Sequence, residues 1–213
     1  EFICTDITDT SLTFVLKSSE ETLKVYPFAF ALKITYTLKE HDLDVCWEVV
    51  NKDSETMYFT IGGHPAFRVP VREGESQSDY RLAFEEQDAL TYLLIDTSVG
   101  TVIADEPHTL SLEKGTCTID PHMFDKDALV FDNGQIQKAG ILLPDGTPYL
   151  TLTSEGFPNF GIWSVPGAPF VCLEPWMGRC DNCGFEKPLS EKANINVLKP
   201  DEEFIKSYQI TVH

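Results

Sequence analysis

The chain has 213 residues, of which 42% are hydrophobic and 11% aromatic, so it can bury a core and is too apolar to be disordered. Its 34 acidic and 16 basic residues give a formal net charge of −18. Such a surface repels phosphate backbones and anionic lipid, so we expect no nucleic-acid or membrane partner and a neutral ligand.

The N-terminal part alternates apolar and polar residues with the period of two that is typical of strands. Residues 28–39 predict a long strand whose even-numbered positions are buried. A polar turn at 40–42 and the alternating residues 43–49 complete a hairpin. A second polar turn, at 51–55, leads to a strand that begins at Met57.

The same alternation continues to the C-terminus, with turn signals between short apolar runs. Further strands are predicted at residues 80–84, 110–112, 141–143, 149–153, 160–164, 170–173 and 207–212. Apolar residues nowhere keep a helical spacing for three turns, so we predict an all-β fold, an antiparallel β-sandwich of two packed sheets. Without repeats, low-complexity tracts or linkers, residues 1–213 are predicted to form a single domain.

Six cysteines occur in a chain that shows neither a signal peptide nor an apolar run long enough to span a bilayer. Their spacing forms no disulfide framework, so we expect reduced thiols and a cytoplasmic location. Cys180 and Cys183 form a C-x-x-C, but a zinc site would need a second pair at similar spacing. We therefore predict no metal.

His64 is the first candidate for chemistry. It follows Gly62 and Gly63, which allow a sharp bend, and precedes Pro65, which favours an extended backbone. This arrangement holds an imidazole at a strand end, and histidine suits proton transfer at neutral pH. A purely structural or surface histidine is the alternative.

Glu174 is the second candidate, because it ends the apolar stretch that begins at Phe170 and is flanked by Pro175 and Trp176. Burial at such a position should raise the pKa of Glu174 and make it a better base. The alternative is an ion pair with an arginine such as Arg179.

Three further residues are weaker candidates. Asp127 precedes the apolar run 128–131 and would lie at the mouth of a strand, unless it is only a polar loop residue. Trp163 and Trp176 offer flat faces on which a sugar ring can stack, or else belong to the core. The sequence contains no phosphate-cradling glycine loop, H-E-x-x-H or G-x-S-x-G, which argues against nucleotide-dependent, zinc-peptidase and α/β-hydrolase chemistry.

The segment Ile61-Gly-Gly-His-Pro-Ala-Phe67, followed by Ala168-Pro-Phe-Val-Cys-Leu-Glu-Pro-Trp176, resembles the bacterial aldose 1-epimerase family of the LacX-like type. The resemblance runs essentially end to end and includes Tyr26-Pro-Phe28 and the segment 124–129. It implies the galactose mutarotase-like β-supersandwich. Family members usually carry an N-terminal histidine–glycine–phenylalanine–alanine–arginine stretch that helps to hold the sugar. This chain has no equivalent, so we expect the fold to be N-terminally incomplete.

The resemblance implies that His64 is the general acid, Glu174 the general base and Asp127 a ligand of a sugar hydroxyl. The expected activity is interconversion of the α and β anomers of a neutral aldohexose, without a cofactor. Glu174 would take the proton of the anomeric hydroxyl while His64 protonates the ring oxygen, and the same steps in reverse close the ring. The sequence predicts neither a particular aldose nor an oligomeric state.

Three alternatives remain open. A glycosidase would use Asp127 and Glu174 as its carboxylate pair, which leaves His64 without a role. A non-catalytic or degenerate carbohydrate-binding protein would hold the sugar without acting on it. A hexose-phosphate epimerase would need a basic cluster for the phosphate, and the strong negative charge argues against one.

Overall fold

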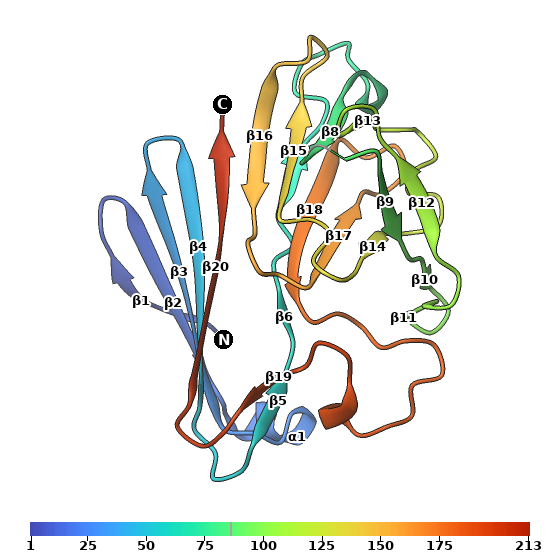
Figure 1. Ribbon diagram of the computed structural model, residues 1–213. Helices are drawn as coiled ribbons and strands as arrows, with labels where there is room; N and C mark the ends of the chain where they lie inside the picture. Colours follow the sequence, from blue (N-terminus) through green and yellow to red (C-terminus); the bar gives the residue numbers. More distant parts are fainter. Residues whose placement is uncertain (86) are drawn as a thin grey trace. The chain divides into compact units, whose positions relative to one another are not determined.

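The structure is a computed structural model that describes residues 1–85 and 87–213. It consists mainly of antiparallel β-strands, which confirms the all-β prediction (Figure 1). Of the helices within these two ranges, none has the length and apolar character needed to cross a membrane. The chain divides into two compact units, one made of Glu1–Phe59 with Ile195–Val212 and the other of Thr60–Asn194 with His213. The single domain predicted for residues 1–213 stays a prediction.

The first unit holds five strands hydrogen-bonded in the order β1-β2-β3-β4-β20, and a two-stranded sheet of β5 and β19. The predicted hairpin is confirmed, because β3 and β4 pair along their whole length, and Val45, Trp47 and Val49 are buried at alternate positions of β4. The predicted burial of the even-numbered positions of β3 is wrong, because these side chains are at most partly buried and Tyr36 and Leu38 are exposed. The strands are β1 (Ile3–Ile7), β2 (Ser11–Lys17), β3 (Phe30–Lys39), β4 (Asp42–Asn51), β5 (Met57–Phe59), β19 (Asn196–Leu198) and β20 (Glu203–Val212).

A short helix, α1 (Glu20–Val25), was not predicted. Its N-terminus is capped by Ser19, whose hydroxyl accepts from the backbone N–H of Thr22, while the Thr22 hydroxyl accepts from the backbone N–H of Ser19. Such a reciprocal cap satisfies two backbone donors that a helix start leaves unpaired. Six residues are too few to show an apolar period over three turns, so the sequence pattern gives no sign of this helix.

The second unit contains two larger sheets. One has the order β16-β15-β8-β13, and the other has the order β14-β17-β18-β6, with β7 also paired to β18. Their bounds are β8 (Arg81–Phe84), β13 (Thr116–Thr118), β15 (Lys138–Leu142), β16 (Pro148–Thr153), β14 (Leu129–Phe131), β17 (Asn159–Trp163), β18 (Phe170–Met177), β6 (Ile61–Gly62) and β7 (Ala66–Arg68). Both sheets contribute fully buried apolar side chains, such as Leu82 and Ile141 from the first and Ile162 and Leu173 from the second, as the two-sheet prediction requires.

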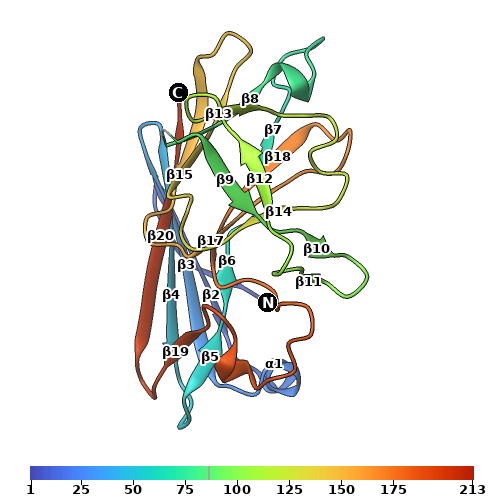
Figure 2. The ribbon, with the colours of Figure 1, turned by 45° about the vertical axis from the view of Figure 1, so that its right-hand side comes forward.

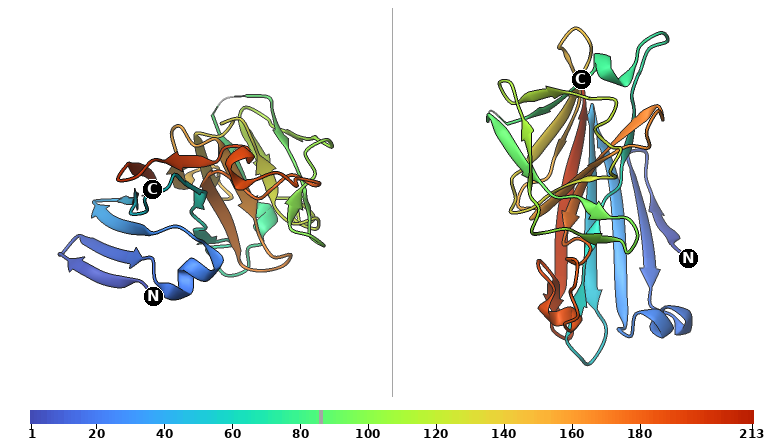
Figure 3. Two further views of the ribbon diagram at one scale, coloured as in Figure 1. Left: turned by 90° about the horizontal axis from the view of Figure 1, so that it is seen from below. Right: turned by 90° about the vertical axis from the view of Figure 1, so that its right-hand side faces the viewer.

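Shorter elements complete the second unit. They are the sheet of β9 (Ala89–Tyr92) and β12 (His108–Ser111), the sheet of β10 (Ile95–Asp96) and β11 (Thr101–Val102), and the 3₁₀ turns η1 (Gln77–Asp79) and η2 (Leu189–Glu191). The β9–β12 pair lies beside β14 (Figures 2 and 3), to which it is joined by backbone bonds between Leu93 and Val130. This pair therefore adjoins the β14 edge of the sheet that carries β18.

β18 is longer than predicted. The sequence suggested a strand at 170–173 with Glu174 at its end, but the strand continues through Pro175 to Met177. Proline lacks a backbone donor, which usually keeps it out of central strands. Here the carbonyl of Pro175 still accepts from the N–H of Gly63, at 3.0 Å, so the ladder persists. Glu174 thus lies inside a central strand.

Candidate active site

Sheet register brings His64 to Glu174. Glu174 lies in β18, whereas His64 lies in the three-residue gap between β6 and β7, both of which pair with β18. Trp176 of β18 faces Gly62 of β6 in an antiparallel register. Two residues further along each strand, the same register sets His64 opposite Glu174.

The segment around His64 follows β18 although it is not itself a strand. Pro65 has no backbone N–H, so it cannot complete a ladder there. On either side of His64 the contact is nevertheless kept, because Gly63 donates to the Pro175 carbonyl at 3.0 Å and Leu173 donates to the Pro65 carbonyl at 3.3 Å. The backbone of His64 is therefore held against β18 from both directions.

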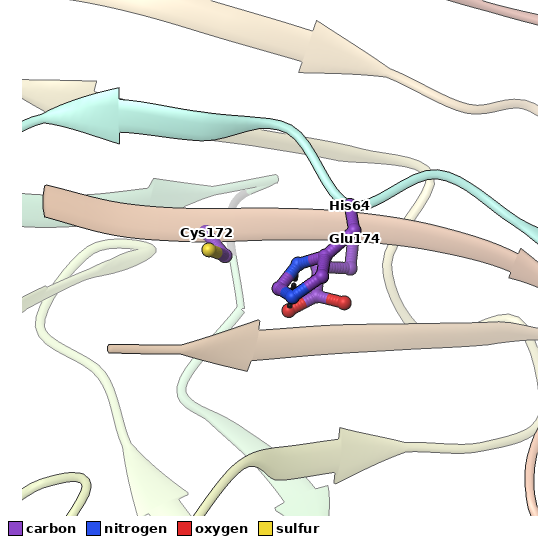
Figure 4. A group of neighbouring side chains, drawn as sticks. All are labelled: His64, Cys172 and Glu174. Atoms are coloured by element: carbon purple, nitrogen blue, oxygen red, sulfur yellow. Dashed lines mark ion pairs between the residues drawn. The ribbon is translucent and has the colours of Figure 1, made fainter. Parts of the chain in front are cut away.

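The side chains of His64 and Glu174 are in direct contact. His64 Nδ1 lies 3.0 Å from Glu174 Oε1, and the imidazole lies over the carboxylate in Figure 4. The side chain of His64 is 60% exposed, whereas that of Glu174 is only 7% exposed. The contact thus joins a buried carboxylate to an imidazole that is exposed to solvent.

The surroundings of Glu174 bring its pKa close to neutral pH. Burial raises its pKa to about 7, and the nearby negative charge of Asp127 acts in the same direction. A hydrogen bond from the side chain of Trp176 opposes this rise. A general base is most effective when its pKa lies close to the working pH.

The alternative in which Glu174 forms an ion pair with Arg179 is wrong, because Arg179 pairs with Asp132. Its guanidinium donates two hydrogen bonds to the carboxylate of Asp132, from Nε to Oδ1 at 2.8 Å and from Nη2 to Oδ2 at 2.7 Å. Asn159 donates to the same carboxylate at 2.7 Å. This pair of a buried arginine and a partly buried aspartate was not predicted, since neither residue stands in a motif that suggests a partner.

Trp163 and Asp127 line a hollow of about 690 Å³, a size that is common for ligand pockets. The ring of Trp163 also lies next to the imidazole of His64, with centroids 5.7 Å apart and planes inclined by 53°. One oxygen of Asp127 accepts from the backbone N–H of Ala128 at 2.6 Å. Neither His64 nor Glu174 lines the hollow, so Trp163 connects the hollow to the His64–Glu174 pair through its contact with the imidazole.

Trp176, the other predicted stacking residue, has different surroundings. Its indole lies over Gly62 and Gly161, at whose positions an added Cβ would come within 2.4 Å of the ring. It also packs against the buried cluster of Leu93, Val102 and Val130. Trp176 is therefore held against the sheet beside Glu174, whereas Trp163 borders the hollow.

Cys172 lies beside the His64–Glu174 pair, and this neighbour was not predicted. One potential ligand atom from each of His64, Cys172 and Glu174 lies within 4.8 Å of the others. Burial raises the pKa of Cys172 to about 12, so the thiol stays protonated at neutral pH, and a metal would require the thiolate. The donor set therefore suits a metal poorly, and its absence stays a prediction. The signal was available, since residues two apart in a strand share a face.

All six cysteines carry free thiols, including the C-x-x-C pair. Cys183 Sγ lies 3.1 Å from the hydroxyl of Thr101, and Cys180 packs near Val102. These contacts give the motif a place in the packing of the loop that follows β18.

Comparison with known proteins gives consistent results. The family model described as aldose 1-epimerase matches residues 2–210. Protein LacX of Lactococcus lactis subsp. lactis is 28% identical over the whole of this chain, which covers 72% of that protein. The X-ray structure of a galactose mutarotase related enzyme from Lactobacillus acidophilus is 30% identical, with a TM-score of 0.91, all of this chain covered and 71% of the other. A galactose mutarotase-like protein from Lactobacillus casei is 28% identical, with a TM-score of 0.86 and coverages of 100% and 73%.

Proposed function

The chain belongs to the aldose 1-epimerase family, and from that premise we propose that it interconverts the α and β anomers of a neutral aldohexose. The observation that carries the proposal is the 3.0 Å contact between the exposed imidazole of His64 and the buried carboxylate of Glu174. Anomer exchange by ring opening needs one group that removes a proton and one that supplies a proton, close together. A histidine and a glutamate in contact meet that need.

In the proposed mechanism Glu174 starts ionised and His64 protonated. Glu174 takes the proton of the anomeric hydroxyl, the bond between C1 and the ring oxygen breaks, and His64 gives its proton to that oxygen. Rotation about C1–C2 then presents the other face of the aldehyde. Ring closure returns the proton from the ring hydroxyl to His64, while Glu174 protonates the carbonyl oxygen, so each turnover restores the starting pair without a cofactor.

Trp163 and Asp127 are proposed to hold the sugar. Trp163 contacts the imidazole of His64 and borders the hollow, so its face is available for the apolar side of a pyranose. Asp127 lies near enough to Glu174 for its charge to raise the pKa of that residue, and its carboxylate can accept from sugar hydroxyls. A carboxylate at this place and a net charge of −18 favour a neutral sugar over a sugar phosphate.

Other parts of the proposal follow from the same premise. The partner is a small sugar, and neither nucleic acid nor a membrane surface is expected to bind a chain of this charge. The cytoplasmic location stays a prediction.

The test is direct. Fresh solutions of α-glucose and α-galactose are followed by polarimetry and by NMR exchange between the anomers, with and without the protein, at one buffer concentration. We expect a rate that rises in proportion to protein concentration. Sugar binding without faster exchange would overturn the proposal in favour of a non-catalytic binding protein, and release of reducing sugar from an oligosaccharide would favour a glycosidase.

A further inference from the structure

We infer that Trp176 is a positioning residue for Glu174: its indole N–H, fixed between two glycines, holds the carboxylate in place beside His64. The kinetic meaning of this inference rests on the proposed function. The placement of the indole does not, because it depends only on the packing of β18 and its neighbours.

The side chains of Trp176 and Glu174 point in the same direction from β18. Residues two apart along a strand point to the same face of a sheet, so Trp176 and Glu174 share a face of β18. The side chain of Trp176 donates a hydrogen bond to that of Glu174. Indole has one donor and no acceptor, so the bond is made by Nε1–H.

The indole ring of Trp176 fits closely against Gly62 and Gly161. A Cβ at Gly62 would lie 2.4 Å from Cδ1 and 3.3 Å from Nε1 of Trp176. A Cβ at Gly161 would lie 2.4 Å from Cζ2 and 3.1 Å from Cε2. Nε1 is bonded to both Cδ1 and Cε2, so it is held between the two glycine contacts. Gly62 is the strand partner of Trp176, and Gly161 is the strand partner of Glu174.

Apolar side chains pack around the indole ring of Trp176. Trp176 packs against Leu93, Val102 and Val130, of which Val102 and Val130 are fully buried. With two glycines beneath the ring and an apolar cluster against it, the indole has little freedom to turn. This surrounding differs from that of Trp163, which borders the hollow and the imidazole. Support of Glu174 therefore explains the surroundings of Trp176 better than stacking on a sugar does.

The chemical consequence concerns the charged form of Glu174. Burial disfavours the carboxylate, and a donor fixed beside it favours the carboxylate and also orients it. Loss of the donor should therefore raise the pKa of Glu174 further and loosen its position. The base would be ionised in fewer molecules at neutral pH.

The first test is Trp176→Phe, which keeps an aromatic ring and removes the N–H. We expect kcat at pH 7 to fall about tenfold and the midpoint of its acidic limb to move up by about one pH unit, with KM changed less than about twofold. Trp47→Phe is the matched control, because Trp47 is a buried tryptophan of β4 in the other unit. It should lower the melting temperature without moving the midpoint. A raised KM with an unmoved midpoint in Trp176→Phe would mean a stacking role and overturn the inference.

The second test leaves the N–H in place and displaces it. Gly161→Ala should push the ring of Trp176 away and shift the midpoint in the same direction as Trp176→Phe. Gly140→Ala is the matched control, since a Cβ there would also be crowded, at 2.9 Å from the Leu150 carbonyl oxygen. Gly140 lies in β15, which belongs to a different sheet from β18 and Trp176. An unshifted midpoint in Gly161→Ala, in a folded protein, would contradict the inference.

A direct titration separates this inference from the proposed function. The carboxyl signal of Glu174, identified by its loss in Glu174→Gln, is followed by ¹³C NMR across pH in the sugar-free protein and in Trp176→Phe. If the wild-type chain fails to exchange anomers but the titration midpoint rises in Trp176→Phe, the proposed function fails and the inference holds. If anomers are exchanged and the midpoint is unchanged, the inference fails and the function holds.

Discussion

His64 Nδ1 and Glu174 Oε1 are 3.0 Å apart because the two residues occupy facing positions on antiparallel chains. A slip of one residue between β18 and its neighbour would turn the carboxylate to the opposite face of the sheet. The pair therefore depends on the backbone bonds of Gly63 and Leu173 on either side of His64.

Replacement of Glu174 by glutamine should abolish anomer exchange. The amide keeps the shape of the side chain but cannot accept the anomeric proton, so we expect kcat to fall by at least about 100-fold. Polarimetry measures the rate, and NMR titration should show that sugar still binds. Glu113→Gln is the control, because the side chain of Glu113 is 83% exposed. Near-normal turnover in Glu174→Gln would exclude Glu174 as the base.

Replacement of His64 by asparagine should remove the proton donor for the ring oxygen. We expect kcat to fall about 100-fold, with the fold intact, because the imidazole is largely exposed. His41→Asn, in the turn between β3 and β4, is the control for loss of an exposed histidine. Far-UV circular dichroism and the melting temperature of both variants would reveal unfolding. If His64→Asn retained full activity, the acid must be another group.

On the acidic side, activity should rise as the pH rises towards about 7, because Glu174 acts as a base only when ionised and burial raises its pKa to about 7. The ratio of kcat at pH 7 to kcat at pH 5.5, measured by NMR exchange at one ionic strength, tests this. A rate that is independent of pH across this range would contradict the proposed role.

The same pKa affects stability. The folded-state pKa of Glu174, about 7, lies above the ordinary value of 4.5, so the folded state binds its proton more tightly than the unfolded state does. The resulting contribution is fully present below about pH 4.5 and is lost as pH rises through about 7. Its size is on the order of 3 kcal/mol. Urea denaturation at pH 5 and pH 8 should show that Glu174→Gln loses less stability over this interval than the wild type does; equal losses would refute the assignment.

Replacement of Arg179 by methionine should destabilise the protein by about 3 kcal/mol. The change leaves the carboxylate of Asp132, which is 20% exposed, without its two guanidinium bonds. Lys24→Met is the control, since Lys24 and its partner Glu21 are both exposed, and such a pair contributes at most about 1 kcal/mol. The shift of the urea midpoint measures both effects. Equal shifts would show that the Arg179–Asp132 pair contributes no more than an exposed pair.

Much of the fold could be predicted because its strands carry their pattern locally. β4 alternates buried and partly exposed residues along its length, as its sequence indicates. β18 was predicted too short because Pro175 and Glu174 look like a strand end, whereas β17 and β6 supply pairing partners up to Met177. Local pattern cannot reveal a bond supplied by a distant segment.

The candidate site was predicted in part. His64 and Glu174 were each recognisable from their neighbours, but their contact depends on the register of β18, which the sequence does not specify. The two tryptophans looked equivalent in sequence and have different surroundings, because Trp176 meets two glycines and Trp163 meets a hollow. Gly161 gave no signal of its own, since its importance arises only from the ring that lies over it.

The division of the chain has a consequence for how the protein is made. Every residue proposed for catalysis or sugar contact lies in the continuous stretch Thr60–Asn194, whereas the first unit is completed only by β20. During synthesis, these residues are therefore all in place in the growing chain before β20, the last strand of the first unit, has been made. A premature stop shortly after Asn194 would spare these side chains and deprive β4 of the neighbour that pairs with it from Asp42 to Val50.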